Sequence, residues 1–187
     1  MISIDRLDGA AVTAAEDAFR LIYAEVFAGP PYYETEADVA AAFDRFRLQT
    51  ALVAALATAP DGEPVGMAYG WRLGPRTDWW DRLTRPVPDD MRREDGRRTF
   101  GLMELAVRAR WRRQGVARRL HEALVGGLDT ERVLLNVHPG NLAAVTAYRS
   151  WGYTKVGDAH PWPGAPPHEV MLLALDAVRP PAPPAGP

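Results

Sequence analysis

Cysteine is missing from this chain of 187 residues. Disulfide bonds, catalysis by a thiolate and metal sites built from cysteine are therefore excluded. Lysine is nearly missing too, since Lys155 is the only lysine among 22 basic residues and arginine supplies the other positive charges. No apolar run approaches the length that crosses a membrane, and the first residues lack the apolar core of a secretory signal. We therefore expect a cytoplasmic protein without a membrane partner.

The composition is that of an ordinary soluble globular protein, with 47% hydrophobic and 25% charged residues. A net charge of -2 gives no reason to expect a nucleic-acid partner. The length suits one domain, which we place at residues 1–176. Residues 177–187 are rich in proline and are expected to be a disordered tail.

Apolar periodicity predicts alternating strands and helices. The stretch 74–99 breaks this pattern with Gly, Pro, Asp and Arg, so we expect an irregular insertion or lid there. Thr35 is positioned to cap the second helix. His121 falls on the helix after residue 115 and is expected at the surface. The predicted strands cover 1–7, 51–58, 64–73, 102–107, 132–137, 154–157 and 169–175, and the predicted helices cover 10–27, 35–47, 116–127 and 141–151.

An arginine-rich turn, Arg112-Arg113-Gln114-Gly115-Val116-Ala117, stands between the strand that ends at Val107 and a helix. The first amides of a helix have no internal partner, and the helix dipole adds positive charge there. Gly115 and Ala117 keep the backbone accessible, and guanidinium groups suit phosphate oxygens. The turn therefore predicts a site for a strongly anionic ligand, although arginine-rich helix starts also occur as plain solvated surface.

A second pattern follows the turn His138-Pro139-Gly140. It runs from Asn141 through Ala144 and Tyr148 to Gly152-Tyr153. Together with Arg112, Gly115 and Ala117, this pattern resembles the GNAT superfamily of acyl-CoA-dependent N-acyltransferases. The resemblance covers roughly residues 100 to 176, and upstream of that stretch it is only suggestive.

The resemblance implies an α/β fold of the mixed α+β kind. Its central mixed, mostly antiparallel sheet would have about six or seven strands, flanked by about four helices and splayed between the fourth and fifth strands. It also implies acetyl-CoA as the acyl donor and no metal. The pantetheine arm would pair with free main-chain groups of the fourth strand. The residues implied in donor binding are Leu105, Ala106, Val107, Arg112, Arg113, Gln114, Gly115, Val116, Ala117, Arg118, Asn141 and Tyr148.

Two residues are candidates for proton transfer. Tyr148 matches the spacing of the family's tyrosine and would act as the general acid, because a phenol can protonate a departing thiolate. Glu104 is an ionisable residue in an apolar strand, where charge is costly without a purpose, and is the candidate base. Alternatively, Tyr148 is a core aromatic, Glu104 pairs with an arginine, and Asn141 is only a helix cap.

Acceptor specificity is expected from aromatic side chains in loops and from a histidine at a strand end. The candidates are Tyr32, Trp79, Trp80, His138 and Trp162. Trp79 and Trp80 could equally anchor the 74–99 insertion to the core or form a subunit contact, which would allow a homodimer. His160 and His168 flank a proline-rich loop and offer no metal spacing.

The leading hypothesis is an N-acetyltransferase in which the amine of a small molecule or a peptide attacks acetyl-CoA directly. A non-catalytic acyl-CoA-binding module for sensing or interaction is the alternative. The presence of both Tyr148 and Glu104 argues against that alternative, since binding alone needs neither. Acidic residues around the remaining arginines argue against a nucleic-acid partner.

Overall fold

The computed structural model describes residues 1–49 and 51–175, so the tail expected at 177–187 lies outside the described residues. Seven strands form one sheet in the order β1-β2-β3-β4-β5-β7-β6. Neighbouring strands are antiparallel except for β4 and β5, which are parallel. This mixed, mostly antiparallel sheet confirms the predicted fold class. The strands are β1 Ser3–Asp8, β2 Val53–Thr58, β3 Pro64–Arg72, β4 Thr99–Val107, β5 Arg132–Val137, β6 Thr154–Ala159 and β7 His168–Ala174.

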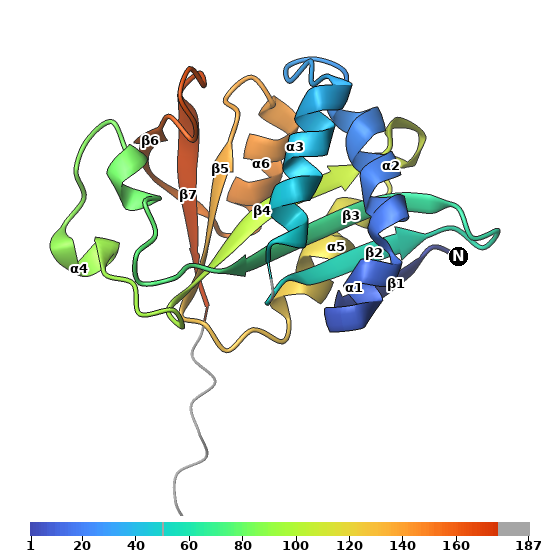
Figure 1. Cartoon of the computed structure of the whole chain (residues 1–187), viewed down its shortest axis with the longest axis horizontal. Helices are drawn as coiled ribbons and strands as arrows, with labels where there is room; N and C mark the ends of the chain where they lie inside the picture. Colours follow the sequence, from blue (N-terminus) through green and yellow to red (C-terminus); the bar gives the residue numbers. More distant parts are fainter. Residues whose placement is uncertain (50, 176–187) are drawn as a thin grey trace, which may run out of the picture.

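Helices cover both faces of the sheet (Figure 1). One face carries α1, α2 and α3, and the other carries α5 and α6. Apolar side chains that alternate along β2, β3 and β4 fill both interfaces, which is the pattern of strands buried on both sides. The helices are α1 Gly9–Ala14, α2 Glu16–Phe27, α3 Glu36–Arg47, α4 Asp89–Arg92, α5 Val116–Val125 and α6 Leu142–Ser150.

The first predicted helix, 10–27, is interrupted in the structure. Ala15 has φ -95° and ψ 3°, outside the helical region, and separates α1 from α2. The break lets α1 contact β1 and β2 while α2 turns its own apolar stripe toward β3 and β4. The prediction that Thr35 caps α3 is confirmed, because Thr35 and Asp38 form a reciprocal capping box.

The sheet opens between β4 and β5. Their pairing covers only Thr99–Gly101 of β4 against Arg132–Leu134 of β5, so the main chain from Leu102 to Val107 is left without a strand on that side. On its other side β4 pairs with β3, with an irregularity where Tyr69 is opposite Glu104 and Gly70 is opposite Leu102. Met103 is the extra residue, and such bulges re-aim the neighbouring side chains. The predicted splay between the fourth and fifth strands is confirmed.

Candidate functional site

The arginine-rich turn has the backbone of an anion site. A 3-10 turn, η2 Ala109–Trp111, leads into it, and Gly115 is the N-cap of α5. Arg113 has φ 64° and Gly115 has φ 75°, both in the left-handed region. Among the described residues no side chain caps α5, so its first amides are left without a side-chain partner there. Successive amides in such a turn form a concave anion-binding surface.

Most side chains of the turn already have partners within the protein. The Nε of Arg112 donates to the carbonyl of Val107 at 3.0 Å, which fixes the turn to the end of β4. Gln114 donates to the carbonyl of Arg110 at 3.2 Å, and Arg118 pairs with Glu122 at 2.8 Å. The residues predicted for donor binding therefore present mainly their main chain, and the β4 main chain at Leu105, Ala106 and Val107 is followed by η2 and then by the turn.

Glu104 lies beside the bulge of β4, opposite Tyr69. The residue is half-buried. Within the described chain this carboxyl group forms no hydrogen bond or ion pair. Its pKa is raised to about 8, mainly by burial and also by the charge of Glu34, while Arg45 opposes the rise. The alternative of an arginine salt bridge on a neighbouring strand is therefore not found among the described residues.

Tyr148 is buried on α6, on the opposite side of the sheet from α2. Its ring packs edge-on against Trp151 and Tyr153, with ring centres 5.5 and 5.4 Å apart. Burial raises the pKa of its hydroxyl, and the nearby Tyr32 and Glu104 raise it further, so the phenol stays protonated. Tyr148 and Glu104 thus approach the opening between β4 and β5 from opposite faces of the sheet.

Asn141 connects two parts of the site. Its side-chain oxygen accepts from the amide of Ala144 at 3.1 Å and caps α6. Its side-chain amide donates to the hydroxyl of Tyr32 at 2.9 Å. The expected helix cap is confirmed, and the bond to Tyr32 is an additional role that no local sequence pattern indicates.

Three residues predicted for the acceptor side belong to one chain of rings. Tyr32 contacts His138, with ring centres 6.0 Å apart, and His138 contacts His168 at 5.2 Å. Trp162 contacts His168 at 5.4 Å. His168, which the sequence gave no reason to select, is therefore the link between His138 and Trp162. Its Nδ1 donates to the carbonyl of Pro166 at 2.8 Å, and burial lowers its pKa.

Trp79 and Trp80 have different surroundings. Trp80 is 5% exposed, and its Nε1 donates to Glu94 at 2.9 Å. Arg132 pairs with the same carboxylate at 2.9 Å and lies over the Trp80 ring. Trp80 therefore anchors the 74–99 insertion to the start of β5. Trp79 lies against Gly101 of β4, and its Nε1 is buried without a hydrogen-bond partner among the described residues.

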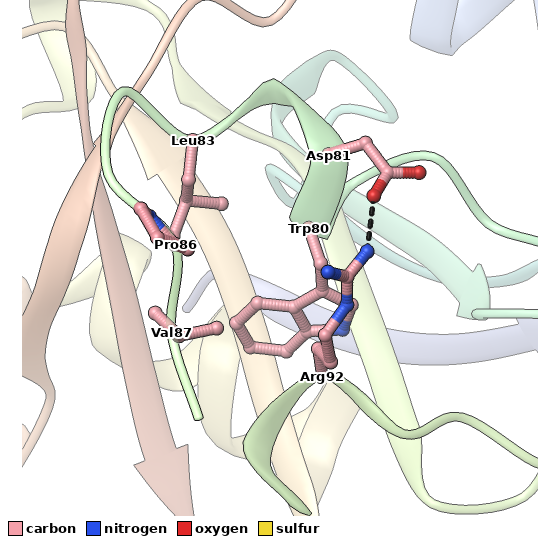
Figure 2. A pocket seen from close by; sticks show the side chains of 6 residues that line it. All are labelled: Trp80, Asp81, Leu83, Pro86, Val87 and Arg92. Atoms are coloured by element: carbon pink, nitrogen blue, oxygen red, sulfur yellow. Dashed lines mark hydrogen bonds and ion pairs between the residues drawn. The ribbon is translucent and has the colours of Figure 1, made fainter. Parts of the chain in front are cut away.

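The outer side of the Trp80 ring faces a small hollow of the insertion (Figure 2). An ion pair between Arg92 and Asp81 closes one side of it. Neither Glu104 nor Tyr148 lines this hollow, so it is separate from the residues predicted for catalysis. Its lining residues are Trp80, Asp81, Leu83, Pro86, Val87 and Arg92.

Several residues near the opening were not selected from the sequence. Glu34, at the end of the loop between α2 and α3, acts on the charge of Glu104. Asn136 of β5 has a buried side-chain oxygen without a hydrogen-bond partner in the described chain. A polar residue inside the apolar run Val133–Val137 was the available signal for Asn136. Tyr23 and Tyr69 gave no such signal, because aromatic residues are usual in an apolar stripe.

The expectation that His121 lies at the surface is wrong. The residue is 4% exposed, and its Nε2 lies 2.9 Å from the hydroxyl of Tyr153. Its ring also packs against Trp151, with centres 4.8 Å apart. The end of α6 covers this face of α5, a contact between segments that are distant in sequence.

Within residues 1–49 and 51–175, no group of three or more His, Cys, Asp or Glu side chains is arranged to hold a metal ion. In the same part of the chain, no helix has the length and apolar character needed to span a membrane.

Comparison with known proteins gives one family. A model described as the Acetyltransferase (GNAT) family matches residues 14–153. Among curated proteins, no sequence matches the chain significantly.

Solved structures share the fold at low sequence identity. The ribosomal-protein-S18-alanine N-acetyltransferase from Escherichia coli is 19% identical with a TM-score of 0.62, over 94% of this chain and 95% of that chain. Arabidopsis thaliana NAA60 in complex with a bisubstrate analogue is 19% identical with a TM-score of 0.63, over 95% and 99% of the two chains. Arabidopsis thaliana Naa50 in complex with the bisubstrate analogue CoA-Ac-MVNAL is 15% identical with a TM-score of 0.59, over 93% and 99%.

Proposed function

Because this chain belongs to the GNAT acetyltransferase family, we propose that it transfers the acetyl group of acetyl-CoA to an amine by direct attack in a ternary complex. One observation carries the proposal. The unpaired edge of β4 ends in a turn with outward-facing amides, and Glu104 and Tyr148 approach that edge from opposite faces. A long anionic thioester fits such an edge and turn.

The free amides at the start of α5 would bind the pyrophosphate of the donor, and Arg113 adds positive charge. The main chain of Leu105, Ala106 and Val107 would pair with the pantetheine arm as a neighbouring strand does. The Naa50 structure holds a bisubstrate analogue that contains CoA, which supports CoA as the donor for this fold.

In the reaction the amine nitrogen bonds to the thioester carbonyl carbon, and the carbon–sulfur bond breaks. Glu104 accepts the proton that the nitrogen loses. Tyr148, which burial keeps protonated, gives its proton to the departing sulfur. The products are an N-acetyl amide and CoA with a free thiol, and solvent returns the two residues to their starting protonation states.

Release of CoA gives a direct test. Because the chain has no cysteine, a thiol reagent detects only the CoA that the reaction produces. We expect acetyl-CoA and CoA to bind in calorimetry, and at least one amine of a panel that includes peptides to drive CoA release. Binding without CoA release for any amine would favour the non-catalytic acyl-CoA-binding module. Absence of binding would contradict the donor assignment.

Two glycine variants test the donor turn. Gly115 has φ 75°, and a Cβ added there would meet nothing within 4 Å, so Gly115→Ala adds backbone strain without a clash. Gly62, in the β2–β3 hairpin, has φ 87° and equally open surroundings. We expect both alanine variants to lose similar stability, but only Gly115→Ala to bind acetyl-CoA more weakly. If Gly115→Ala and Gly62→Ala bind acetyl-CoA with equal affinity, the placement of the donor at this turn is contradicted.

A further inference from the structure

The two halves of the sheet meet at a short junction. The first half comprises β1 to β4, and the second half comprises β5, β7 and β6. Within the described residues, the halves pair only where Thr99–Gly101 of β4 is opposite Arg132–Leu134 of β5. Beyond this junction the strands part and leave the opening of the candidate site. Because a strand rises roughly 3.3 Å per residue, a small change of angle at the junction displaces Ala106 of β4 much further.

A buried carboxylate of the 74–99 insertion bonds to both sides of this junction. Oε1 of Glu94 accepts from Oγ1 of Thr99 at 2.8 Å and from Nη2 of Arg132 at 2.9 Å. Nε of Arg132 also donates to Oγ1 of Thr99 at 2.7 Å, so the first residues of β4 and β5 form a closed triangle with Glu94. The side chain of Glu94 is 1% exposed and that of Arg132 is 7% exposed. Glu94 therefore connects the two halves of the sheet at their junction.

The same cluster ties the insertion to the junction. Nε1 of Trp80 donates to Oε1 of Glu94 at 2.9 Å. Nη2 of Arg132 also donates to the carbonyl of Met91 at 2.7 Å. The insertion is therefore fixed to the junction by hydrogen bonds of buried groups.

An ion pair at this position is costly to bury. Oε2 of Glu94 is buried and has no hydrogen-bond partner among the described residues. A charge loses its hydration on burial, and a buried ion pair often adds no more stability than apolar side chains of the same size. Its hydrogen bonds are directional, however, and hold their groups at set distances. The cluster is therefore better suited to fixing a geometry than to adding stability.

We propose that Glu94 is a positioning residue that fixes the angle between the two halves of the sheet, and with it the width of the opening that receives the pantetheine arm. The proposal rests on the proposed function, because that function places the arm in the opening. The nucleotide end of the donor would bind at the start of α5, which packs against β1, β2, β3 and β4 of the first half. The arm would lie between the halves, so only its binding depends on their angle.

The first test measures the geometry of the opening. Because the chain has no cysteine, two introduced cysteines are the only sites for spin labels. Ala109→Cys labels an exposed residue just after β4, and Thr146→Cys labels an exposed residue of α6, which follows β5. Pulsed electron–electron double resonance gives the distribution of distances between the labels. We expect this distribution to be about twice as broad in Glu94→Gln as with Glu94 in place, and an equal width would overturn the proposal.

A milder variant keeps the proposal testable if Glu94→Gln does not fold. Glu94→Gln leaves Arg132 buried without its counter-charge, whereas Thr99→Val removes one hydroxyl and keeps the shape of the side chain. Thr130→Val is the matched control, because Thr130 is also buried next to β5 but its hydroxyl donates to the main-chain carbonyl of Arg132. We expect a broader distribution in Thr99→Val but not in Thr130→Val. Equal distributions in these two variants would overturn the proposal.

Calorimetry then connects the angle to donor binding. The two ligands are acetyl-CoA and the nucleotide 3′-phosphoadenosine 5′-diphosphate, which is the donor without its arm. We expect Glu94→Gln to bind acetyl-CoA about tenfold more weakly than wild type, and the nucleotide to bind both proteins equally. Equal losses for both ligands, as a general loosening of the fold would cause, or no loss for either, would overturn the proposal. If neither ligand binds wild type, the donor assignment fails, while the label distances still decide the role of Glu94.

Discussion

The hydroxyl of Tyr32 accepts a hydrogen bond of 2.9 Å from the side-chain amide of Asn141. Because the other end of the same amide group caps α6, one side chain connects the loop after α2 to the helix that carries Tyr148. Residues that are far apart in sequence are thereby held around the opening between β4 and β5. The position of the loop between α2 and α3 is coupled to the start of α6.

A double-mutant cycle measures this coupling. Asn141→Ser keeps a good helix cap but is too short to reach Tyr32, and Asn141→Ala loses both functions. In wild type, Tyr32→Phe should cost about 1 kcal/mol in the free energy of unfolding, from the lost hydrogen bond. In the Asn141→Ser background, Tyr32→Phe should cost almost nothing, and Asn141→Ala should be about 1 kcal/mol less stable than Asn141→Ser. Urea denaturation provides the values, and equal costs of Tyr32→Phe in both backgrounds would show that the two side chains are not coupled.

Two neighbouring tyrosines, Tyr148 on α6 and Tyr153 just before β6, allow effects on catalysis to be distinguished from effects on stability. The Tyr148 hydroxyl has no hydrogen-bond partner within the described chain, so Tyr148→Phe should leave stability nearly unchanged. As the proposed general acid, its loss should lower kcat about 100-fold, while acetyl-CoA affinity stays close to wild type. The assay is CoA release with an amine that supports turnover.

Tyr153→Phe is the matched control. It removes a hydroxyl that lies 2.9 Å from His121 and should cost about 1 kcal/mol of stability without a loss of turnover. If Tyr148→Phe retains full turnover, the assignment of the general acid is wrong.

Local sequence patterns predicted the parts of the site that the backbone determines. The turn at Gly115 and the cap at Asn141 follow from residue spacing along one segment, and the splay of β4 was implied by the resemblance to the GNAT superfamily. The electrostatic environment of Glu104 does not follow from one segment, because Glu34 and Arg45 act on its charge from other segments of the chain. His121 was misplaced for the same reason, since Trp151 and Tyr153 cover it from a distant segment.

Burial of His121 makes the fold sensitive to acid. Burial lowers its pKa from 6.5 to about 4, so between these values the unfolded chain binds more protons than the folded chain. Stability should therefore fall as the pH drops from 6.5 to 4, with His121 contributing on the order of 2 kcal/mol. His121→Gln should reduce the slope of unfolding free energy against pH in that range. His160→Gln is the control, because His160 is exposed, and an unchanged slope in His121→Gln would rule out His121 as the cause.

Glu104 affects the pH dependence of folding stability in the opposite direction. Its pKa is raised from 4.5 to about 8, so the folded chain binds more protons than the unfolded chain between these values. Ionisation of the folded protein is unfavourable there, and stability should fall as the pH rises from 4.5 through 8. Glu104→Gln removes this loss. The variant should match wild type below pH 4.5 and should exceed it above pH 8 by an amount on the order of a few kcal/mol.

The same carboxyl group should control the pH dependence of turnover. A base must be ionised to accept the amine proton, so CoA release by wild type should rise with pH and level off above about pH 8. Glu104→Gln should be slow at every pH and should lack this rise, while its acetyl-CoA affinity is kept. A variant that is more stable at pH 8 yet inactive would show that the fold tolerates the cost of a half-buried carboxylate at position 104 because catalysis needs it. A Glu104→Gln enzyme with wild-type turnover and the same pH profile would instead assign proton removal to solvent.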